Sequence, residues 1–190
     1  MNLQKINVKL FLDAPQPVPV DALLPIFARW REDAAHPARW VDMADYAHVP
    51  TGPGIMMIGH QGNLALDLAD PGPGILWVNK ADLEGEIDVR IVEVFRRTLG
   101  MVRTLIAESG FPSTLRPRPG FWELVFNDRL VTPHTEETAV VVQPAVEAAL
   151  NTIFGTDRYT LVSEKDPARR YGFTIHSDTV DSLEAVAARL

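Results

Sequence analysis

The chain of 190 residues contains no cysteine. Disulfide bonds, thiolate nucleophiles and cysteine-ligated zinc or iron–sulfur centres are therefore excluded. The same absence leaves the redox compartment open, because a protein without cysteine is stable in a reducing or an oxidising environment.

Basic side chains are in the minority. The 18 lysines and arginines face 25 aspartates and glutamates, which gives a formal net charge of −7. Nucleic-acid binding needs a basic face that displaces counterions, and an anionic membrane surface also attracts basic proteins. We therefore expect neither nucleic acid nor a membrane as a partner.

Long hydrophobic runs are missing as well. The longest apolar runs are far shorter than the roughly 20 residues that a membrane span needs. Near the N-terminus, apolar residues alternate with others from Ile6 to Leu12, unlike the continuous apolar region of a signal peptide. The sequence predicts a soluble, cytoplasmic protein.

The local motifs of several enzyme classes are absent. The chain contains no G-x-S-x-G, no G-x-G-x-x-G after a strand, no H-E-x-x-H and no calcium-binding loop. Many active sites have no local signature, so the absence of these motifs argues only moderately against an enzyme. The balance favours a protein without catalysis of its own.

The apolar pattern predicts one α+β domain over residues 1–190. Period-2 alternation indicates strands, longer apolar stripes indicate helices, and Pro and Gly clusters separate them. Strands are expected at Ile6–Leu12, Arg39–Tyr46, Ile55–Ile58, Leu64–Leu68, Ile75–Asn79, Trp122–Phe126, Tyr159–Val162 and Tyr171–Ile175. Helices are expected after Asp21, from Glu84 to Ser109, from about Thr135 to Gly155, and after Ser177.

This element order favours a largely antiparallel sheet with helices packed on one face. The order is ferredoxin-like if one hairpin of the first half is an insertion. It also fits a duplicated β-α-β-β order, with a pseudo-repeat of residues 1–110 and 120–190.

The stretch from Tyr46 to Trp77 is a strand meander that carries His48, His60 and Asp67 between glycine- and proline-rich turns. Turn and strand-end residues often display function on a rigid scaffold. Two histidines and a carboxylate suit zinc or non-haem iron. However, the histidines also fit as solvated loop and turn residues, and their spacing is not that of a local metal motif. These three residues are the candidate ligand-binding set, with no metal or cofactor expected.

Asp67 is the most informative of the three, because it lies between Leu66 and Leu68 inside a strand. Its side chain faces either solvent or a pocket, and the alternation favours solvent. Trp40 and Trp77 lie on strands whose second face is a candidate partner or ligand surface.

Five arginines lie in the predicted turns and strand ends of the second half. If they converge, they form an anion pocket with bidentate donors, and dispersed surface charge is the alternative. The five are Arg116, Arg118, Arg129, Arg169 and Arg170.

Two stretches, Val49–Leu68 and Phe126–Thr138, resemble an uncharacterised family of small bacterial proteins. The resemblance covers most of the chain. It implies no activity, cofactor or catalytic residue for the chain.

The leading hypothesis is a non-catalytic binding or assembly module that binds an unknown protein partner or associates with itself as a homodimer. An unpaired strand edge offers a route to such self-association. The alternative is a small-molecule or metal-binding enzyme that uses the Tyr46–Trp77 meander.

Overall fold

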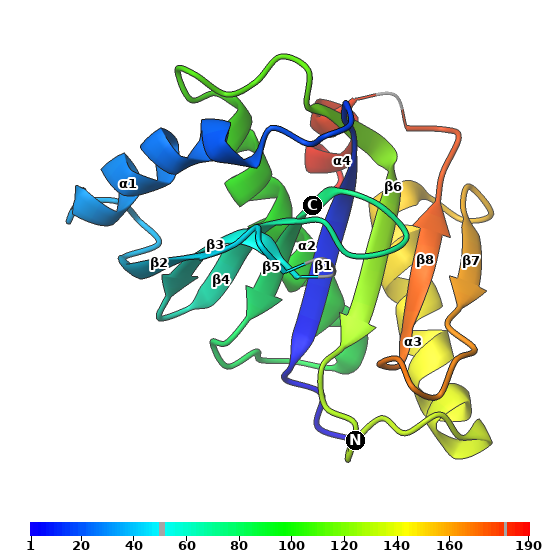
Figure 1. Cartoon of the computed structure of the whole chain (residues 1–190). Coiled ribbons are helices and arrows are strands. Elements are labelled where there is room, and N and C mark those ends of the chain that lie inside the picture. The colour runs from blue at the N-terminus through cyan, green and yellow to red at the C-terminus, as the bar shows by residue number, and fades with distance from the viewer. Residues whose placement is uncertain (50–51, 181) are drawn as a thin grey trace.

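Figure 1 shows a computed structural model of the chain, which describes residues 1–49, 52–180 and 182–190. The strands are β1 (Ile6–Asp13), β2 (Trp40–Tyr46), β3 (Gly54–Gly59), β4 (Gly62–Asp67), β5 (Gly74–Asn79), β6 (Arg116–Phe126), β7 (Thr160–Ser163) and β8 (Gly172–His176). The helices are α1 (Leu24–Glu32), α2 (Ile87–Ile106), α3 (Glu136–Phe154) and α4 (Leu183–Ala187), and a 3₁₀ turn (Val20–Leu23) leads into α1.

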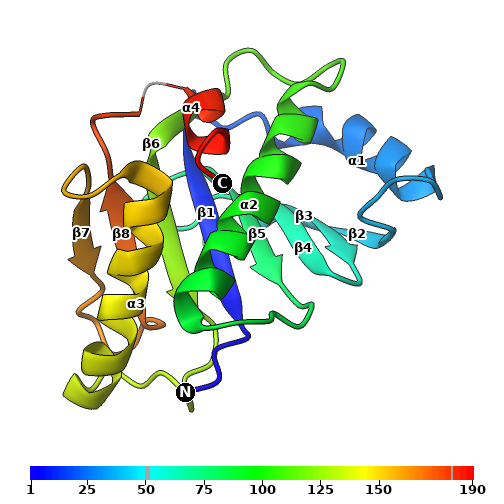
Figure 2. The ribbon, with the colours of Figure 1, turned by 180° about the vertical axis from the view of Figure 1, so that it is seen from behind.

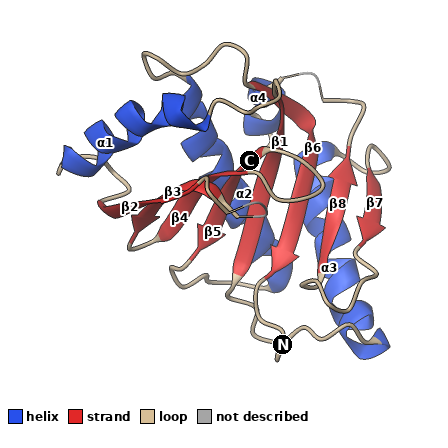
Figure 3. Ribbon diagram, in the orientation of Figure 1, coloured by secondary structure: helices blue, strands red, loops and turns tan. Residues whose placement is uncertain are grey.

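The described strands form one eight-stranded sheet in the order β2-β3-β4-β5-β1-β6-β8-β7. Every neighbouring pair is antiparallel, as Figure 3 shows. β1 and β6 lie near the middle of the sheet, and β2 and β7 are its edges. The expected α+β class and antiparallel sheet are confirmed.

Helices α2 and α3 cover one face of the sheet, as the view from behind shows (Figure 2). The core lies between these helices and the sheet, where Phe95 of α2 packs against Trp122 of β6 and Phe154 of α3. Along β1, Ile6, Val8, Leu10 and Leu12 point into this core. No described helix lies over the opposite face of the sheet, which we call the open face (Figure 3).

The open face of β1 is nevertheless buried, although no described helix covers it. Asn7, Lys9 and Phe11 keep only 4%, 1% and 4% of their exposed surface. The loop of residues 68–73, between β4 and β5, contributes to this burial. It crosses the open face, so that the backbone oxygen of Asp70 accepts a hydrogen bond from Arg169, just before β8, at 3.1 Å.

Strand β2 departs from simple alternation. The pairing of β2 with β3 shifts register between Trp40 and Asp42, which marks an irregularity of the β-bulge type. The shift lets Trp40 and Met43 both pack on the core, whereas plain alternation assigns them to opposite faces. Trp40 and Trp77 keep 8% and 3% exposure, so neither supplies an exposed aromatic surface.

Local capping explains the ends of α3. The side chain of Thr135 accepts a hydrogen bond from the backbone N–H of Thr138, and Gly155 ends the helix with a φ of 94° that favours glycine. Pro144 lies inside this helix without dividing it. Within the described residues, no helix is both long enough and apolar enough to cross a membrane.

Candidate functional site

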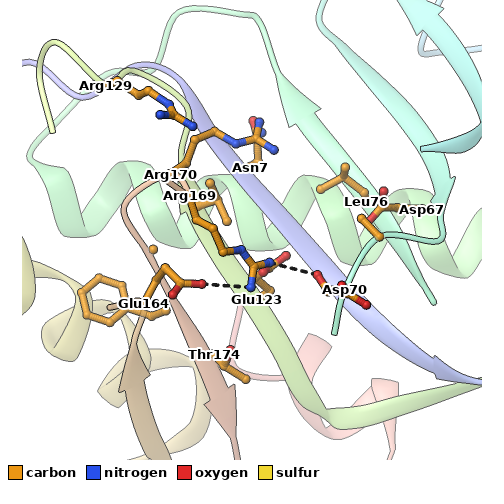
Figure 4. Close-up of a pocket in the computed structure, with 14 residues that line it drawn as sticks. Asn7, Asp67, Asp70, Leu76, Glu123, Arg129, Glu164, Arg169, Arg170 and Thr174 are labelled. Carbon is orange, nitrogen blue, oxygen red and sulfur yellow. Dashed lines mark hydrogen bonds and ion pairs between the residues drawn. The ribbon is translucent and has the colours of Figure 1, made fainter. Parts of the chain in front are cut away.

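A polar pocket of about 240 Å³ lies on the open face of the sheet, over strands β1, β6 and β8 (Figure 4). Strand ends, the 68–73 loop and the β7–β8 turn contribute its walls. Its lining residues are Asn7, Asp67, Ala69, Asp70, Leu76, Glu123, Val125, Arg129, Glu164, Arg169, Arg170, Gly172, Phe173 and Thr174.

Lys9 lies beneath this pocket and is almost completely buried. Its Nζ donates to Oδ2 of Asp67 at 2.5 Å and to the backbone oxygen of Ala69 at 3.0 Å. It also lies 5.2 Å from the centre of the Phe11 ring. A buried ammonium group is tolerated only when paired and hydrogen-bonded, and Asp67 meets that need. Asp67 is 7% exposed, so the sequence-based preference for a solvent-facing Asp67 is wrong.

Gly74 provides the space that Lys9 needs. Gly74 pairs with Asp67 in the sheet, and the Lys9 side chain passes over it to reach that carboxylate. A Cβ atom at position 74 would lie 2.7 Å from Cε of Lys9 and 2.6 Å from the backbone oxygen of Leu10. A glycine is therefore required here by close packing.

Glu123 of β6 lies directly across from Lys9 in the sheet. Burial raises the pKa of its carboxyl group, and the nearby charge of Asp67 adds to this effect. The charges of Lys9, Arg169 and Arg170 act in the opposite direction. Among the described residues, no side chain hydrogen-bonds to Glu123, so its carboxyl group is available to a ligand in the pocket.

Asn7 is a second unsatisfied polar group in the lining. It is 4% exposed, and its Oδ1 atom has no hydrogen-bond partner among the described residues. Buried polar atoms are normally paired, and an orphaned one calls for an explanation. Asn7 lines the pocket, so a ligand donor there would satisfy this oxygen once the amide group turns toward it.

Three of the five candidate arginines converge on the pocket, namely Arg129, Arg169 and Arg170. Arg169 is paired with Glu164 at 3.1 Å. Arg129 donates to the backbone oxygen of Ala168 at 2.6 Å, and Arg170 donates to Oδ1 of Asn127 at 2.9 Å. Neither Arg129 nor Arg170 forms an ion pair with a described carboxylate, so both keep free donors.

The other two arginines lie at the opposite end of β6. Arg116 pairs in the sheet with Asp13, and Arg118 lies 3.6 Å from a carboxylate oxygen of the same Asp13. The guanidinium group of Arg118 also stacks on Phe121, 4.0 Å from the ring centre. These two arginines therefore serve as matched controls for the pocket arginines.

The candidate ligand-binding set from the sequence is not brought together. His60 lies in the turn before β4, whereas Asp67 is the last residue of that strand, so the length of β4, roughly 16 Å, lies between them. His48 follows β2 and is exposed, as is His60. The described residues include no group of three or more metal-ligating side chains. Of the three, only Asp67 lines the pocket.

Sequence reasoning missed Asn7, Lys9 and Glu123. Their signal is the alternation itself, which places Asn7 and Lys9 on one face of the first strand and Glu123 on one face of Trp122–Phe126. Such positions are normally read as solvated. The crossing of the 68–73 loop over this face, together with the β7–β8 turn, makes Asn7 and Glu123 pocket residues and buries Lys9 beneath them.

The raised pKa of Glu123 predicts the effect of a neutral replacement. Because its pKa in the folded state lies above the ordinary value of 4.5, the folded state holds this proton more tightly, and stability falls as the pH rises past 4.5. Glu123→Gln is expected to raise the Tm at pH 7, because it removes the cost of ionising a carboxyl group in this desolvated position.

Thermal unfolding of both proteins from pH 4 to pH 8 checks this prediction. The difference should shrink toward zero as the pH falls below 4.5, where the carboxyl group is protonated in both states. Glu32→Gln, at an exposed position of α1, should leave the Tm unchanged. A Glu123→Gln protein that is less stable than the parent at pH 7 would contradict the prediction.

Comparison of the chain with models of known protein families gives no match, and comparison with curated protein sequences gives none either.

Proposed function

We propose that the chain is a non-catalytic binding protein whose open-face pocket holds a small organic anion. The observation that carries this proposal is the convergence of Arg129 and Arg170 on one end of the pocket, beside the unsatisfied oxygen of Asn7 (Figure 4). Guanidinium groups with free donors match the geometry of a carboxylate or a phosphate. The ligand would donate a hydrogen bond to Asn7 Oδ1 at the same end.

The small volume of the pocket limits the size of the ligand. At about 240 Å³ it falls below the roughly 300–1,000 Å³ of most small-molecule sites. It suits a molecule of a few carbon atoms and not a nucleotide or a peptide. We prefer binding to catalysis because the carboxylate of Asp67 is already held by Lys9 at 2.5 Å.

The sheet pairing supports a further proposal about the origin of the pocket. β1 and β6 open the two halves of the chain and pair with each other, and each also pairs with the last strand of its own half, β5 or β8. This arrangement favours the duplicated order of residues 1–110 and 120–190 over an accidental similarity. The pocket then contains residues of both halves.

Isothermal titration calorimetry with sodium butanoate and with inorganic phosphate tests the anion site. We expect saturable binding of at least one of them. The double variant Arg129→Gln/Arg170→Gln should weaken that binding at least tenfold, because each charge-assisted hydrogen bond is worth about 1.5–3 kcal/mol.

Arg116→Gln/Arg118→Gln is the matched control, since it removes the same two charges at the far end of β6. It should leave the affinity within twofold of the parent. The proposal is overturned if neither probe binds, or if both double variants weaken binding equally. In the second case the effect is one of net charge and not of the pocket.

Self-association stays a prediction. The edge strand β2 has an unpaired side in the described sheet, and it exposes Val41 and Tyr46 by 55% and 40%.

A further inference from the structure

We propose that the ligand is a zwitterion, a small organic acid that also carries an ammonium group. Its anionic group binds Arg129 and Arg170, and its ammonium group binds the carboxylate of Glu123. This inference rests on the anion site proposed above and names the class of ligand that fills it.

The first argument is the charge balance of the pocket. Four carboxylates line it, and three arginines together with Lys9 beneath it supply four positive charges. Four of these eight groups already form ion pairs within the protein, Lys9 with Asp67 at 2.5 Å and Arg169 with Glu164 at 3.1 Å. With all groups ionised the site is neutral, and a ligand without net charge keeps that balance. Arg129 and Arg170 are exposed at the pocket, whereas Glu123 is partly buried there.

The groups that remain are of both signs. Arg129 and Arg170 have no described carboxylate partner, and Glu123 has no described donor. Asp70, the remaining carboxylate, is exposed on the crossing loop. A bound molecule that satisfies both guanidinium groups and Glu123 must therefore carry a negative and a positive end.

The second argument is the arrangement of these groups along the sheet. Asn7 pairs with Val125 near the end of β6, and Val125 pairs with Gly172, the first residue of β8. Arg129 follows the end of β6 and Arg170 precedes the start of β8, so Asn7 lies close to the segments that carry both arginines. Glu123 lies one step further along β6, opposite Thr174 of β8. Diagonal neighbours of this kind are about 7–8 Å apart. A chain of a few carbon atoms spans that distance from the Asn7 end of the pocket to Glu123.

The third argument concerns the proton on Glu123. Without ligand, burial and the charge of Asp67 favour the neutral carboxyl group, while Lys9 on β1 and Arg169 and Arg170 in the β7–β8 turn favour the ionised one. A ligand ammonium group favours the ionised form of Glu123, so zwitterion binding should strengthen as the pH rises through the pKa of this carboxyl group. A simple anion makes no favourable contact with the ionised carboxylate of Glu123, so its binding does not favour loss of the carboxyl proton. The two ligand classes therefore differ in the sign of their pH dependence.

The test is calorimetry with three matched probes, 4-aminobutanoate, butanoate and butylamine, at pH 5 and pH 7.5. We expect 4-aminobutanoate to bind at least tenfold more tightly than butanoate at pH 7.5, and butylamine to bind more weakly than either. The affinity of 4-aminobutanoate should rise from pH 5 to pH 7.5, whereas the affinity of butanoate should stay level or fall. Glycine, 3-aminopropanoate and 6-aminohexanoate, each with its matched carboxylate, extend the series in length.

Glu123→Gln supplies the decisive comparison. It should remove the tenfold advantage of the amino acid and its rise with pH, whereas butanoate, which gains nothing from a carboxylate at position 123, should bind at least as tightly as to the parent. Glu32→Gln should change neither. If butanoate binds but no amino acid of the series exceeds its matched carboxylate, the zwitterion is overturned while the anion site stands. If neither class binds the parent protein, the proposed function fails as well.

Discussion

Replacing Lys9 with methionine is expected to lower the free energy of unfolding by about 3–5 kcal/mol. The substitution keeps the volume of the side chain but leaves Asp67 buried without its cation. Lys9 keeps 1% exposure and Asp67 7%, so the carboxylate loses its cation where little water reaches it. Urea unfolding followed by tryptophan fluorescence measures the change, and the four tryptophans provide the signal.

The double variant Lys9→Met/Asp67→Leu should recover most or all of that loss. Removing both charges removes the cost of burying them, and buried ion pairs replaced by apolar side chains are often neutral or stabilising. Arg96→Met is the surface control, because it breaks an ion pair with Glu93 in which Arg96 is half exposed, and it should cost less than about 1 kcal/mol. A loss below 1 kcal/mol for Lys9→Met, or no recovery in the double variant, would contradict this account of the buried pair.

Gly74→Ala is expected to destabilise the protein by about 1–3 kcal/mol, the usual range for an overpacked position. The new methyl group would meet the backbone oxygen of Leu10 at 2.6 Å and the Lys9 side chain at 2.7 Å. The side chain can move, but the backbone of the central strand β1 cannot move without disturbing the sheet. Urea unfolding measures the loss.

Gly72→Ala is the matched control, two residues away in the same loop region. A Cβ atom at position 72 has no neighbour within 4 Å, so this substitution should change stability by less than about 0.5 kcal/mol. Equal losses for the two variants would indicate an effect of backbone flexibility in the loop and not the close approach of Lys9. In that case the lack of a side chain at position 74 would not be what makes room for Lys9 and its ion pair with Asp67.

Much of the fold could be predicted because the sequence pattern is local. Alternation at Ile6–Leu12 and Trp122–Phe126 marks the two central strands, and a threonine followed by glutamates marks the start of α3. Helix ends were less well predicted, since α2 covers Ile87–Ile106 and not the whole of Glu84–Ser109. The β-bulge beside Trp40 reverses the faces of β2, and a register shift of this kind leaves no local signature in the sequence.

The candidate site was predicted only in part, because it depends on contacts between distant segments. The sequence marks five arginines as an anion site only if they converge, with dispersed charge as the alternative, and three of them, Arg129, Arg169 and Arg170, line the pocket. Asp67, the informative residue of the meander, lines it too. The role of Lys9 depends on a partner 58 positions away, and Asn7 and Glu123 depend on strand pairing between β1 and β6. Without the path of the 68–73 loop, these polar residues are indistinguishable from an ordinary solvated face.

The most direct test of the central claim is a ¹⁵N NMR titration that follows the side-chain amide of Asn7 and the Nε–H groups of Arg129 and Arg170 as 4-aminobutanoate is added. Our account predicts saturable shifts at these three residues and at the backbone of Glu123, and their loss in Arg129→Gln/Arg170→Gln. It predicts no comparable shifts at Arg116 or Arg118, at the far end of β6. Shifts that are absent from the pocket, or that spread evenly over all five arginines, would contradict it.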